Sequence, residues 1–207
     1  KHRRVKAHRI LALGLGLFIV SHLAIHLGAV MGSSVHLAML GKVRWIYSNP
    51  IVEPVLVAAI LVQVFIGAKL VRRRWKMPRK GFWGWVQILS GCYLAAFLLM
   101  HSSAALITRY ILGFETNFYW AAGTLNVDPL QYVFVPYYFF GVLSVFAHLA
   151  SALYFGWRGH GSKVAKVLLV AGLITGAVIV CTFAGVFYEI NLPPEYRDLF
   201  ETYLSKP

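Results

Sequence analysis

The chain has 207 residues, of which 59% are hydrophobic and 13% are charged. Its mean hydropathy of +0.67 is too high for a water-soluble globular domain, so the composition predicts an all-α, polytopic membrane protein. The formal net charge of +13 would suit a protein that binds nucleic acid, but the positions of the charges along the chain argue against that interpretation.

Five apolar stretches are each long enough to cross a bilayer as a helix, because about 20 residues at about 1.5 Å each span the hydrocarbon core. They cover residues 10–31, 51–70, 82–107, 130–156 and 164–188. We therefore predict a single membrane domain over residues 1–207, a bundle of five transmembrane helices. An odd number of crossings places the two termini on opposite sides of the membrane.

The basic residues are distributed unequally between the two sides. Fifteen of the twenty Lys and Arg residues fall in the N-terminal arm, in the connections between spans two and three and between spans four and five, or within three residues of these connections. The other side has five basic residues and all seven acidic residues. By the positive-inside rule the N-terminus is cytoplasmic and the C-terminus exterior, in a multi-pass protein of the plasma (inner) membrane. Anionic lipid accounts for the basic excess, so no nucleic acid is expected as a partner.

The first span carries two histidines, His22 and His26, one turn apart on a single helix face. Its glycines would let a neighbouring helix or a flat ligand approach closely. The exterior segment 33–50 is expected to form a short amphipathic helix at the interface, with His36 exposed to solvent.

The second span contains no histidine, and its one deep polar residue is Gln63. We interpret Gln63 as a hydrogen-bonding partner between helices, which is common in membrane bundles.

The third span carries Gln87 and Gly91 in its inner half and His101 in its outer half. An imidazole at that depth has no water to bond and needs another partner.

The remaining elements carry one further candidate residue. The long aromatic connection 110–129 is expected to form a lid on the membrane surface. The fourth span carries His148 in its inner half, and the fifth has neither charge nor histidine between Lys166 and Glu189. We interpret the glycines of that span as packing residues, and we expect the polar tail to fold back against the lid.

Depth in the membrane groups the histidines into two layers. Counting about 1.5 Å per residue from the flanking charges places His101 about 12 Å and His22 about 15 Å from the outer edge. His148 lies about 15 Å from the inner edge, in the layer of Gln63, where it has no histidine partner. Two imidazoles on separate helices at one depth are suited to ligate haem iron from both sides, with His26 as an alternative ligand. For His148, structural packing, a quinone hydrogen bond and five-coordinate haem stay open.

The sequence resembles the five-helix cytochrome b membrane-anchor subunit of the succinate:quinone oxidoreductase and quinol:fumarate reductase family. The resemblance covers all five spans in order, and one short motif on each of spans one, three and four carries it. These motifs are Gly16-Leu17-Phe18 followed by His22; Trp85-x-Gln87-x-x-x-Gly91 followed by Phe97 and His101; and His148 followed by Leu153-Tyr154.

The resemblance implies haem b and quinone as cofactors. It makes His22 and His101 the axial ligands of an outer haem, and His148 one ligand of an inner haem. The family takes the other inner ligand from the second helix, where this sequence has Gln63 or, in a shifted alignment, Ala68. Neither is an ordinary haem ligand, which puts the second haem in doubt.

Three functions are consistent with these observations. The first is a membrane anchor that passes electrons between quinone and cytoplasmic flavoprotein and iron–sulfur subunits, an electron-transfer subunit rather than an enzyme on its own. The second is a stand-alone membrane cytochrome b that exchanges electrons between quinol and an exterior acceptor, which the short inner loops favour. The third is a haem-free accessory subunit of a larger membrane complex. A quinone would need hydrogen-bond partners, for which His26, Glu53 and Gln87 are candidates.

Overall fold

The computed structural model describes residues 2–76, 81–157 and 161–205, which form helices and no strands. This confirms the all-α prediction. The helices in chain order are α1 (His2–Gly28), the 3-10 turn η1 (Ala29–Met31), α2 (Ser33–Tyr47), α3 (Val52–Trp75), α4 (Gly81–Tyr110), α5 (Phe118–Asn126), α6 (Gln131–Gly156), α7 (Gly161–Phe183) and α8 (Pro194–Ser205).

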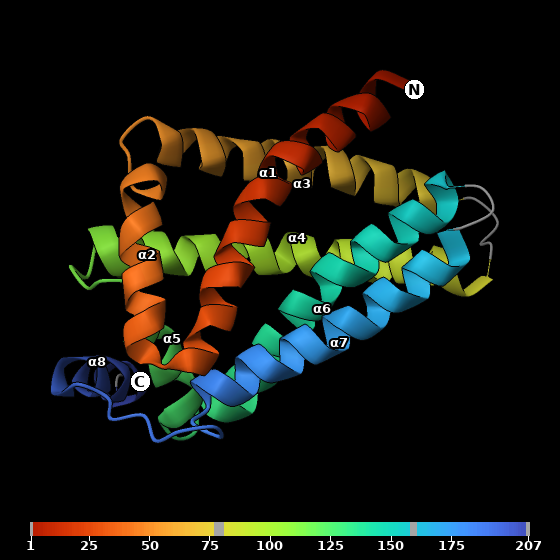
Figure 1. Cartoon of the computed structure of the whole chain (residues 1–207). Coiled ribbons are helices and arrows are strands. Elements are labelled where there is room, and N and C mark those ends of the chain that lie inside the picture. The colour runs from red at the N-terminus through yellow and green to blue at the C-terminus, as the bar shows by residue number, and fades with distance from the viewer. Residues whose placement is uncertain (1, 77–80, 158–160, 206–207) are drawn as a thin grey trace.

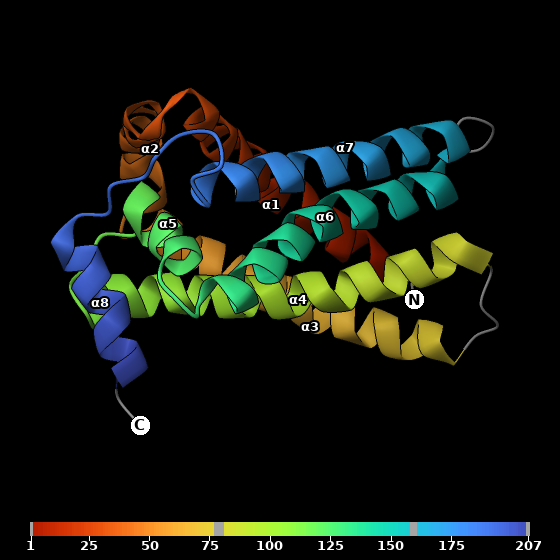
Figure 2. The same cartoon turned by 90° about the horizontal axis from the view of Figure 1, so that it is seen from below.

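Five of these helices, α1, α3, α4, α6 and α7, are long and apolar enough to cross a bilayer, which confirms a multi-pass membrane protein. Figure 1 shows α2 lying across one end of this bundle, with α5 and α8 at the same end. We call this the capped end. The N-terminus lies towards the other, open end, and the C-terminus lies beside the cap (Figures 1 and 2).

Three helix boundaries differ from the predicted spans by five residues or more, and one of them is the end of α3, at Trp75 rather than at residue 70. Helix α1 begins at His2 rather than at residue 10, because the basic residues that precede the apolar run are themselves good helix formers. Helix α7 ends at Phe183 rather than at residue 188, since Gly185 adopts a φ of 76°. The amide of Val186 then donates to the carbonyl of Cys181 at 2.9 Å, which is the bond that closes a helix with a left-handed glycine.

Close packing of α6 against α7 depends on glycine. A β-carbon on Gly172 would lie 2.5 Å from the β-carbon of Phe146, and one on Gly176 would lie 3.2 Å from the carbonyl oxygen of Phe139. These two glycines therefore have the packing role that the sequence indicated. At the capped end the two helices adjoin a buried cluster made of Ala29, Phe118, Ala122, Leu125, Val142, Ile179 and Phe183.

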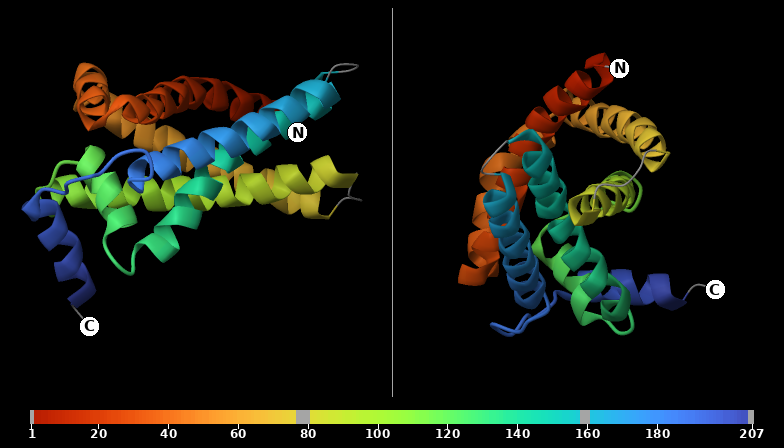
Figure 3. Two further views of the ribbon diagram at one scale, coloured as in Figure 1. Left: turned by 60° about the horizontal axis from the view of Figure 1, so that its bottom comes forward. Right: turned by 90° about the vertical axis from the view of Figure 1, so that its right-hand side faces the viewer.

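The cap consists of three helices outside the predicted crossings. Helix α2 confirms the helix expected in segment 33–50. The side chain of Asn117 accepts a hydrogen bond from the amide of Tyr119 at 2.9 Å and so starts α5 inside the predicted lid. The hydroxyl of Tyr196 on α8 donates to the carbonyl of Glu115 at 3.0 Å, so the tail packs against the lid as expected (Figure 3).

Candidate functional site

Four histidines converge where α1, α2 and α4 meet near the capped end. His22 and His26 come from α1, His36 from α2 and His101 from α4. The ring centres of His22 and His101 lie 6.0 Å apart, with 66° between the ring planes. The Nε2 atoms of His22 and His26 lie 3.1 Å apart, and Nδ1 of His26 lies 3.2 Å from Nε2 of His36. We call this group the four-histidine cluster.

The two facing rings, His22 and His101, are each supported by a phenylalanine one helical turn earlier. Phe18 stacks on His22 with ring centres 5.6 Å apart and planes 17° apart. Phe97 stacks on His101 at 5.2 Å and 9°. Gly141 on α6 makes room for Phe97, because a β-carbon there would lie 2.4 Å from the phenyl ring. Packing therefore restricts the orientation of both imidazoles.

His36 does not face solvent, so its predicted exposure is wrong. Only 2% of its surface is exposed, and its ring lies 5.5 Å from those of Phe118 and Phe183. Burial lowers the pKa of His36 from 6.5 to about 4, so the ring is neutral at physiological pH. No sequence pattern indicates this environment, because it arises from the packing of α2 against helices that are distant in the chain.

A second pair of histidines lies farther towards the open end, between α1 and α6. The ring centres of His8 and His148 are 6.4 Å apart, with 80° between their planes. The inference that His148 has no histidine partner in its layer is therefore wrong. It failed because α1 was expected to begin after His8. A signal was present: His8 precedes His22 by 14 residues, which is nearly four helical turns along one side of α1.

Two small residues of α4 hold His148 in place. A β-carbon on Gly91 would lie 3.0 Å from Cε1 of the imidazole, so the ring occupies the space that a side chain would fill. The hydroxyl of Ser90 donates to the carbonyl of Val86 at 2.6 Å and lies 3.3 Å from Nδ1 of His148. Since its proton is already used, Ser90 can only accept from Nδ1–H, and in that tautomer Nε2 of His148 is an acceptor.

Unsatisfied polar atoms surround this pair. Gln63 on α3 reaches across to α1, with its Nε2 3.5 Å from Nε2 of His8, so it has the interhelical role predicted for it. Three buried atoms have no hydrogen-bond partner within the described part of this site: Nδ1 of His8, Oε1 of Gln63 and Oε1 of Gln87. Such atoms are costly to leave unpaired in an apolar bundle, so a polar partner at this place would lower that cost.

Both imidazole pairs have the separation that a shared metal needs. Two ring nitrogens at about 2 Å from one metal place the ring centres about 6 Å apart. In residues 2–76, 81–157 and 161–205, no group of three or more His, Cys, Asp or Glu side chains forms a metal site. A metal held by either pair would therefore have two protein ligands and take its other ligands from a cofactor. In the four-histidine cluster, Nε2 of His22 lies 3.1 Å from Nε2 of His26, so a nitrogen of either ring is near that ligand position.

Glu53, a candidate partner for quinone, is already paired. Its carboxylate forms an ion pair with Arg109 at the capped end of α4 and accepts a hydrogen bond from the hydroxyl of Tyr110 at 2.5 Å. Arg109 also donates to the hydroxyl of Ser48 at 3.0 Å. These contacts give Glu53 a structural role between α3 and α4.

No family model, curated protein or solved structure matches this chain. The resemblance to the cytochrome b anchor subunits therefore rests on the sequence motifs alone. What the site does chemically has to be argued from its own side chains.

Proposed function

We propose that this chain is a haem b electron-transfer subunit that exchanges electrons between the quinone pool and a redox partner. The observation that carries the proposal is the separation of 6.0 Å between the rings of His22 and His101, which come from two membrane helices. Two neutral imidazoles at this spacing are a donor set suited to haem iron. A haem held there would supply one-electron redox chemistry.

The role of this chain's residues is to hold and orient that group. His22 and His101 would hold the iron, while Phe18 and Phe97 keep the two rings in position. The apolar surroundings supply a low dielectric, which tunes the redox potential. His26, bonded to His22, is the alternative ligand at that position.

The pair of His8 and His148 supports a second cofactor position about 21 Å away along α1, counting 14 residues at about 1.5 Å each. Nε2 of His148 would be the acceptor in the tautomer whose Nδ1–H donates to the hydroxyl oxygen of Ser90. The unpartnered oxygens of Gln63 and Gln87 would accept hydrogen bonds from a polar ligand such as quinol. Two positions at different depths would carry electrons across the membrane rather than along one face.

The identity of the redox partner separates two versions of the proposal. The family resemblance favours flavoprotein and iron–sulfur subunits on the cytoplasmic side. The folded cap of α2, α5 and α8 favours the second version, a membrane cytochrome b with an exterior electron acceptor, because this end carries three helices outside the crossings whereas the connections at the open end are short in sequence. Purification of the native protein distinguishes them, since only the first version brings flavin and iron–sulfur clusters with the chain.

The test of the haem proposal is a reduced-minus-oxidised spectrum together with the haem content per chain. We expect a low-spin b-type haem signal. His101→Ala should remove the part of it that comes from a haem held by His22 and His101. His148→Ala is the matched control, because it removes an imidazole of the same kind from the other layer and should leave that signal in place. A purified, folded chain without haem would refute the proposal and leave the haem-free accessory role. Equal loss of the signal in both variants would refute the separation into two sites.

A further inference from the structure

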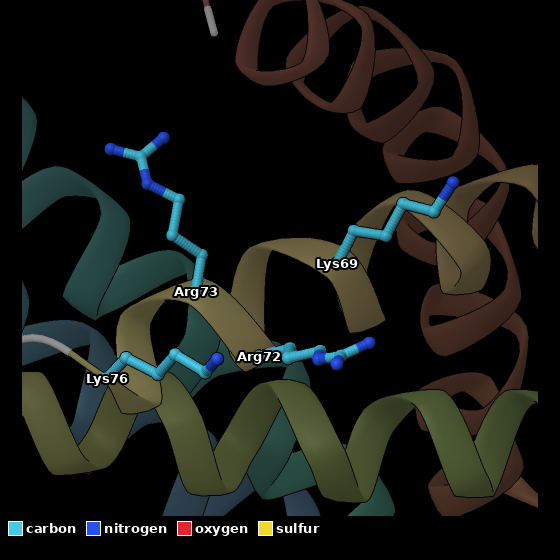
Figure 4. A pocket seen from close by; sticks show the side chains of 4 residues that line it. All are labelled: Lys69, Arg72, Arg73 and Lys76. Atoms are coloured by element: carbon cyan, nitrogen blue, oxygen red, sulfur yellow. The ribbon is translucent and has the colours of Figure 1, made fainter.

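A basic hollow lies on α3 at the open end of the bundle. Figure 4 shows the four side chains that line it, and its volume is about 440 Å³. All four are exposed cations: Lys69, Arg72 and Arg73 come from the last two turns of α3, and Lys76 follows the helix directly. The carbonyl end of the helix favours cations at this place, so these positive charges are stable without an acidic neighbour.

No acidic side chain of the chain neutralises this hollow. The structure describes all seven Asp and Glu residues, and none of them lines it. The ion pairs in the described part of the chain are Glu53 with Arg109 and Glu115 with Arg44. Glu53 lies 16 residues before Lys69 on the same helix, about 24 Å away. A ligand for the hollow must therefore bring its own negative charge.

The surface of α3 next to the hollow is apolar and faces outward. Val62 and Phe65 precede Lys69 by seven and four residues, so they lie on the same face of the helix. Val62 is 46% exposed and Phe65 is 59% exposed. The ammonium group of Lys69 lies 3.7 Å from the ring centre of Phe65, directly where the basic and apolar surfaces meet. The same helix face thus offers cations at the membrane edge and an apolar strip inside the membrane.

We propose that this face of α3 binds an anionic phospholipid, with the phosphate in the basic hollow and an acyl chain along Val62 and Phe65. The chemistry recognised is a phosphate ester, which lysine and arginine bind by charge and hydrogen bonds. Free phosphate shares that chemistry but would not use the apolar strip. An acidic protein segment would not use it either, because it would remain in water beyond the membrane edge.

The site is tested by native mass spectrometry of the full-length chain in neutral detergent, titrated with phosphatidylglycerol and, separately, with phosphatidylcholine. We expect tighter binding of phosphatidylglycerol. Each cation near an anionic group contributes about fivefold to affinity, so the double variant Arg72→Gln/Arg73→Gln should bind phosphatidylglycerol roughly thirtyfold more weakly. The single variant Lys69→Gln should lose about fivefold.

The matched control is Lys163→Gln/Lys166→Gln, which removes the same charge from exposed positions on α7. It should change phosphatidylglycerol binding by less than about twofold, since neither residue lines the hollow. Equal losses in the two double variants, or equal affinity for the two lipids, would overturn the proposal. Displacement of the lipid by inorganic phosphate or by polyglutamate would overturn the phospholipid as the occupant and assign the hollow to a free anion or an acidic partner. Circular dichroism checks that each variant is folded.

Discussion

The ion pair between Glu53 and Arg109 is expected to be a main support of the capped end. It joins α3 to α4, and the two side chains are only 14% and 18% exposed. Arg109→Gln leaves the Glu53 carboxylate with the Tyr110 hydroxyl as its remaining donor among these contacts. Breaking a buried pair in this way costs about 3–5 kcal/mol, and partial exposure favours the lower end, about 3 kcal/mol. Reversible unfolding in mixed micelles measures this loss.

A second ion pair supplies the control. Arg44 and Glu115 lie 2.8 Å apart, but the glutamate side chain is 69% exposed. Arg44→Gln should therefore cost less than about 1 kcal/mol. The double variant Glu53→Gln/Arg109→Gln should recover part of the loss, because it leaves no buried charge unpaired. Equal small losses from Arg109→Gln and Arg44→Gln would refute the reasoning that burial decides the strength of these pairs.

Two further substitutions test the packing beside the four-histidine cluster and at the capped end of the bundle. Gly141→Ala would force the Phe97 ring to move, so we expect a net loss of about 1–2 kcal/mol in unfolding free energy despite the better helix propensity of alanine. Gly14→Ala is its control, since nothing lies within 4 Å of that β-carbon, and it should stabilise by up to about 1 kcal/mol. Tyr188→Phe removes the hydrogen bond of 2.7 Å to the carbonyl of Ala29 and should cost about 1 kcal/mol by the same unfolding measurement. A stabilising Gly141→Ala, or a neutral Tyr188→Phe, would contradict the packing described here.

The sequence predicted the positions of some of the buried histidines and not of others. His22 and His101 could be paired because each depth follows from a count of residues along a helix of known rise. His36 could not be placed, since its burial depends on α2 folding against α5 and α7. His8 was missed because five basic residues around it suggested a solvated arm, whereas α1 continues through them. Charge marks where a membrane span ends, but it does not mark where a helix ends.

The sequence by itself determined the number of long apolar helices and the positions of most polar side chains along them. The reason is that a backbone in lipid has to satisfy its own hydrogen bonds, so every long apolar run becomes a helix of fixed rise. Only the tertiary structure decided which imidazoles face each other, because the rotation of each helix about its axis follows from side-chain packing. Gly91 has no side chain, so the imidazole of His148 can occupy that space. Gly141 in the same way leaves room for Phe97 beside His101.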